Sequence, residues 1–138
     1  MRNVKNSDQV ISVPKIKVDE KIIEDALNQP DTEKQVVLNC RVYLEQYFCS
    51  IRIWNTTYIA DTQSAHKSML LNCYGIKLAP EWLPVVGCRY ISFVLIMEGL
   101  PKSSNSFKLC EPAPNKNGFF SKEIFRNQSD IYDVELYV

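Results

Sequence analysis

The chain has 138 residues, a length that suits one domain with a hydrophobic core of its own. Its 16 Lys and Arg residues balance 16 Asp and Glu residues, so the formal net charge is zero. This balance, with no run of basic residues denser than Lys15–Lys17, argues against nucleic acid or an anionic membrane as a partner.

Residues 1–33 form a polar segment that differs from the rest of the chain. Its periodic part predicts one short amphipathic helix near residues 19–28, with Asp19 as the N-cap and Pro30 beyond the end. We expect this helix either to cover a sheet or to dock on a partner. No apolar stretch long enough for a secretory signal or a membrane span occurs, which predicts a soluble, cytoplasmic protein. The apolar positions of the predicted helix are Ile22, Ile23, Ala26 and Leu27.

From residue 34 onward, apolar and polar side chains alternate with a period of two, as in half-buried strands. The run 88–101 is apolar on both faces, so we expect a central, covered strand there. Residues 79–87 contain two prolines and are predicted to be a loop, and Gly75 is expected at a bulge or bend. The stretches that favour strands are 34–46, 48–55, 56–61, 67–78, 88–101, 106–111, 118–125 and 130–138.

Seven or eight short strands separated by turn residues indicate an all-β domain over residues 34–138. Most strands have one apolar and one mixed face, which favours two stacked sheets over a small barrel. The sequence therefore predicts an antiparallel β-sandwich preceded by the short N-terminal helix.

A resemblance points to the same fold. The segments CSIRIWNTTYIAD, HKSMLL, VLIMEGLP followed by SFKLCE, and GFF with RNQSDIYDVEL resemble a group of small uncharacterised bacterial proteins with immunoglobulin-like β-sandwiches. The similarity covers roughly residues 36–138. It implies an immunoglobulin-like fold, and it carries over no catalytic residue.

The five cysteines are an odd number and show no Cys-x-x-Cys spacing, so we interpret them as free thiols in a reducing compartment. His66 is the only histidine and has no second ligand at metal-binding spacing, which predicts a loop residue and no metal or other cofactor. Asp61 is expected to bond to the backbone two residues further on, as Asp does at turns. Strand-end carboxylates at Asp61, Glu98 and Glu111 could form a catalytic pair, although such groups are usually solvated.

Two functional hypotheses remain open. The first is a non-catalytic interaction or structural module that meets another protein or a second copy. If strands 34–46 and 48–55 pair, their outward faces would form one patch of aromatic and arginine side chains, types enriched at interfaces, unless residues 1–33 cover Trp54. The alternative is a ligand-binding protein or enzyme with a site in the loops at one end of the sandwich. The candidate interaction residues are Arg41, Tyr43, Arg52, Trp54 and Trp82.

Overall fold

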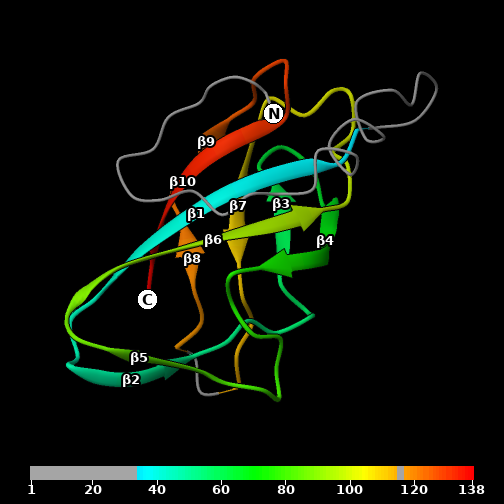
Figure 1. Cartoon of the computed structure of the whole chain (residues 1–138). Coiled ribbons are helices and arrows are strands. Elements are labelled where there is room, and N and C mark those ends of the chain that lie inside the picture. Colours follow the sequence, from blue (N-terminus) through cyan, green and yellow to red (C-terminus); the bar gives the residue numbers. More distant parts are fainter. Residues whose placement is uncertain (1–33, 115–116) are drawn as a thin grey trace.

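The structure is a computed structural model that describes residues 34–114 and 117–138, and these residues form ten β-strands and no helix (Figure 1). The helix predicted near 19–28 lies outside the described residues. The strands are β1 Val36–Leu44, β2 Phe48–Ile51, β3 Tyr58–Asp61, β4 Lys67–Tyr74, β5 Leu83–Val86, β6 Arg89–Met97, β7 Ser106–Cys110, β8 Phe120–Ser121, β9 Ile124–Phe125 and β10 Ile131–Tyr137.

Seven of the strands close into a barrel. The hydrogen-bonded order is β3-β4-β6-β1-β10-β8-β7, and β7 then pairs with β3 to complete the circle, while β9 pairs antiparallel with β7. The closing pair is antiparallel and matches Tyr58 with Cys110. β1 and β10 run parallel, with Val37 opposite Ile131, whereas the other pairings in the barrel are antiparallel.

The prediction of an antiparallel, immunoglobulin-like sandwich is therefore wrong, because the strands form one closed, mixed barrel instead of two stacked sheets. The physical reason is that alternation of apolar and polar residues specifies one buried face per strand, and a sandwich and a small barrel both satisfy it. Closure depends on the long-range pairings of β3 with β7 and of β1 with β10.

The barrel interior is filled by the inward-facing residues of the alternating strands. β1 contributes Leu38, Cys40 and Val42, all nearly inaccessible to solvent. β6 lies between β1 and β4, and its residues from Phe93 to Met97 are buried on both faces, which confirms the predicted central strand. The outward side of this part of the sheet has a second small cluster, made of Val37, Val94 and Ile96.

β2 and β5 form a separate two-stranded sheet that continues the β1–β6 pair beyond a bend. The antiparallel register of β1 with β6 ends at Leu44 opposite Arg89, and that of β2 with β5 begins at Phe48 opposite Val86. Between them, Gly87 donates its backbone N–H to the carbonyl of Tyr47. We call this bent pair the ribbon. Its β2–β5 part lies beyond one end of the barrel, at the bottom of Figure 1.

Two local expectations have opposite outcomes. Residues 79–87 were expected to be a loop, but β5 lies within them, and Pro84 is tolerated because β5 pairs on one side only, with β2. Gly75 directly follows β4 with φ 84°, a left-handed conformation that glycine adopts easily, so the predicted bend is confirmed. Over the residues described, no helix is long and apolar enough to cross a membrane.

Candidate binding cavity at one end of the barrel

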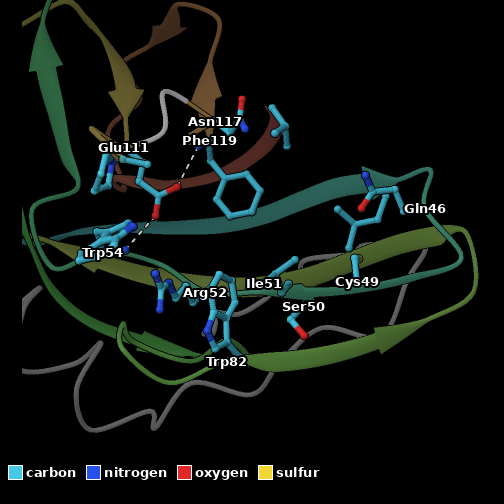
Figure 2. A pocket seen from close by; sticks show the side chains of 14 residues that line it. Gln46, Cys49, Ser50, Ile51, Arg52, Trp54, Trp82, Glu111, Asn117 and Phe119 are labelled. Atoms are coloured by element: carbon cyan, nitrogen blue, oxygen red, sulfur yellow. Dashed lines mark hydrogen bonds between the residues drawn. The ribbon is translucent and has the colours of Figure 1, made fainter.

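A cavity of about 710 Å³ lies where the β2–β5 part of the ribbon meets the end of the barrel (Figure 2). One wall comes from β2 and the residues after it, including Ser50 and Arg52. The opposite wall comes from Glu111, just after β7, and Phe119, just before β8. Trp82, which precedes β5, lies at the opening and is 53 % exposed. The volume is in the range of small-molecule sites, roughly 300–1,000 Å³.

Glu111 joins the two walls. Its Oε2 accepts the backbone N–H of Trp54 at 2.8 Å, and its Oε1 accepts the backbone N–H of Phe119 at 2.9 Å (Figure 2). Gly118 allows the segment before Phe119 to lie close to the backbone of Glu111. A Cβ at this position would lie 1.9 Å from the backbone oxygen of Glu111. The carboxylate therefore fixes two segments that lie far apart in the sequence.

Burial disfavours the charged form of Glu111 and raises the pKa of this carboxyl above its ordinary value. The two backbone N–H donors and the nearby guanidinium of Arg52 act in the opposite direction, and they offset only part of the desolvation. Since both carboxylate oxygens already accept a hydrogen bond, we assign Glu111 a positioning role.

Arg52 contacts both tryptophans of the chain. Its Cζ lies 3.8 Å from the ring centroid of Trp82 and 4.8 Å from that of Trp54, and Figure 2 shows the guanidinium between the two indoles. Nη1 also donates to the carbonyl of Pro80 at 3.1 Å. Arginine has five N–H donors, so this one protein acceptor leaves further donors on a side chain that lines the cavity.

The predicted interaction residues fall into two separate groups. Arg52, Trp54 and Trp82 meet at the cavity. Arg41 and Tyr43 lie on β1, which pairs with β6 and β10 and not with β2, so the expected single patch does not form. Arg41 lies over the ring of Tyr90 at 4.2 Å and forms an exposed ion pair with Glu135 at 3.1 Å.

The other singled-out polar residues lie away from the cavity. Asp61 accepts the backbone N–H of Gln63 at 3.3 Å, which confirms the predicted turn. The hydroxyl of Ser64 also donates a hydrogen bond to Asp61 at 2.6 Å, and this bond lowers the pKa of the Asp61 carboxyl. His66 is exposed between β3 and β4, where its Nε2 lies 3.0 Å from the hydroxyl of Ser68. Residues 34–114 and 117–138 contain no group of three His, Cys, Asp or Glu that could hold a metal ion, and all five cysteines are free.

Glu111 is the cavity residue whose burial the sequence analysis did not predict, since it was expected to be solvated. A signal was nevertheless present. Phe107, Leu109 and Glu111 share one phase of the period-two alternation, and all three are buried. Continuing the alternation one step past the apolar part of the strand would have placed the carboxyl group on the inward face.

Comparisons of the chain with protein-family models, with curated proteins and with solved structures gave no match. The case for a function therefore depends on the residues and geometry of the cavity.

Proposed function

We propose that this chain is a non-catalytic binding domain whose ligand site is the cavity at the end of the barrel. The observation that carries the proposal is the cavity of about 710 Å³, with two tryptophans and an arginine in its lining. Binding suits this lining better than catalysis does, because both oxygens of Glu111 already accept backbone hydrogen bonds. This proposal corresponds to the alternative hypothesis from the sequence, a ligand-binding protein with its site in the loops at one end of the domain.

The test is a screen of chemically diverse fragments against the full chain, read by protein-observed NMR. We expect binders to shift the backbone signals of Trp54 and Phe119, because their N–H groups donate to the carboxylate of Glu111, which lines the cavity. Ser50→Phe should fill the cavity from β2 and abolish these shifts, whereas Ser103→Phe, at an exposed turn, should leave them unchanged. Fragments that bind equally well to the Ser50→Phe variant would contradict the proposal.

Self-association through the ribbon is a second candidate, and a specific observation favours it. Exposed rings form edge-to-face pairs along the ribbon, Tyr43 with Tyr90 at 5.0 Å and Tyr47 with Phe48 at 4.7 Å between centroids. Phe48 is 71 % exposed, and Val86 opposite it is 53 % exposed. A second copy is the occupant we propose, because the formal net charge of zero weakens the repulsion between copies.

Sedimentation velocity over a range of protein concentrations tests this second candidate. We expect Phe48→Asp to remove a concentration-dependent increase in mass. Phe125→Asp is the matched control, because Phe125 is also a strand phenylalanine with 73 % exposure and lies on β9, away from the ribbon. A wild-type protein that stays monomeric at every concentration would refute self-association and leave the cavity proposal intact.

We further propose a cytoplasmic location without nucleic acid or membrane as partner. Free thiols at all five cysteines are in keeping with a reducing compartment, and the balanced charge offers no general attraction for a polyanion.

A further inference from the structure

The charges of the cavity indicate what kind of ligand it would take. Among the described residues that line it, Arg52 is the cationic side chain and Glu111 the acidic one. The oxygens of Glu111 accept hydrogen bonds from the backbone N–H groups of Trp54 and Phe119, and these two donors partly compensate the negative charge of this carboxylate. Arg52 has N–H groups beyond the one that binds the carbonyl of Pro80. The remaining N–H donors of Arg52 therefore suit a ligand that accepts hydrogen bonds.

The surroundings of Arg52 restrict the geometry of that acceptor. The indole rings of Trp82 and Trp54 lie against the guanidinium, so a ligand is left the N–H groups that point away from these rings. A guanidinium edge presents parallel N–H groups in one plane, which match the two oxygens of a carboxylate. A doubly charged phosphate fits less well, because the site has a single cation and an acidic side chain close to it.

The size and lining of the cavity show that a carboxylate alone would not fill it. About 710 Å³ is available, and the side chains of Leu44, Ile51 and Phe119 add apolar surface to that of the tryptophans. Phe119 also packs against the core ring of Phe93 with 5.9 Å between centroids, so this apolar wall of the cavity is continuous with the core. An apolar group on the ligand would thus be desolvated here.

We infer that the cavity binds an organic carboxylate attached to an apolar group, with the guanidinium edge of Arg52 holding the carboxylate and Trp82 packing on the apolar part. This inference rests on the proposed function, because it names the ligand class of the same site. A free small carboxylic acid and the C-terminal carboxylate of a peptide share this chemistry, and the experiment distinguishes them.

The experiment compares two isosteric probes, phenylacetate and the neutral phenylacetamide, on the full chain. Intrinsic fluorescence is a selective readout, because the chain has two tryptophans and both line the cavity. We expect phenylacetate to bind at least about tenfold more tightly than the amide, as a charge-assisted pair implies. Equal affinities for acid and amide, or tighter binding of inorganic phosphate than of phenylacetate, would overturn the inference without using any variant.

Two variants assign the difference to Arg52. Arg52→Met keeps a long apolar side chain against the indoles and should remove the preference for the acid. Arg41→Met is the matched control, because Arg41 also lies against an aromatic ring but on the outside of β1, and it should keep the full preference. A preference that survives in Arg52→Met would contradict the assignment.

The source of the carboxylate is resolved with N-acetyl-Gly-Gly-Phe, tested with a free and with an amidated C-terminus. Tighter binding of the free peptide than of phenylacetate identifies a peptide C-terminus, and the reverse order identifies a small free acid. If neutral probes enter the cavity as well as acids do, the carboxylate inference fails while the proposed binding function stands. If the fragment screen also leaves the cavity signals unchanged, the proposed function fails with it.

Discussion

The side chain of Glu111 accepts the backbone N–H of Trp54 at 2.8 Å across a separation of 57 residues in the sequence. The bond joins the segment after β7 to the turn that begins at Trp54, where Thr57 donates its backbone N–H to the carbonyl of Trp54. With the second bond to Phe119, it holds the cavity in shape.

Glu111→Gln should destabilise the fold by about 1–3 kcal/mol, because one buried backbone donor then loses its acceptor. An amide offers one acceptor oxygen, so either Trp54 or Phe119 would face an NH₂ group. Chemical denaturation followed by circular dichroism measures the change. Glu135→Gln is the control, since its exposed ion pair with Arg41 should contribute less than about 1 kcal/mol. Equal effects of the two substitutions would contradict the role of Glu111.

The advantage of Glu111 over Gln should decrease as the pH rises. The pKa of Glu111 is raised in the folded state, so between its unfolded and folded values the folded protein binds more protons than the unfolded chain. Unfolding free energy therefore falls as the pH rises through this window. The shift of Asp61 has the opposite sign, and it cancels when wild type and Glu111→Gln are compared at each pH. A difference that grows with pH would refute the raised pKa.

Gly118→Ala should disturb the cavity through the backbone. The new Cβ would overlap the backbone oxygen of Glu111, so the two segments must separate, at a cost of roughly 1–3 kcal/mol. We expect shifts in the NMR signals of Trp54 and Phe119. Gly87→Ala is the control, because it meets nothing within 4 Å and its cost comes from φ +89° alone. Unchanged signals in Gly118→Ala would contradict the close approach.

The five thiols should react in an order set by burial. Cys88 is exposed and should be alkylated first, whereas Cys40 is fully inside the barrel and burial raises the pKa of its thiol. Timed iodoacetamide labelling followed by peptide mass spectrometry gives the order. Unfolding without reductant should make all five reactive, and a count near one would instead reveal two disulfides.

Much of the secondary structure could be predicted because its signal is local. Alternation along residues 34–46 places Leu38 and Cys40 inside and Asn39 outside, whatever the strand pairs with. The same holds for β6, where apolar residues on both faces require cover on both, and for Asp61, whose side chain bonds only two residues away.

The closed barrel and its cavity were decided by tertiary structure. Nothing in the local pattern pairs Tyr58 with Cys110, or makes β10 run parallel to β1. The bend of the ribbon likewise sends Arg52 and Trp54 to the end of the barrel, away from Arg41 and Tyr43. Alternation specifies which face of a strand is buried, whereas the partner of each strand depends on packing between segments far apart in the chain, and the site is built from those segments.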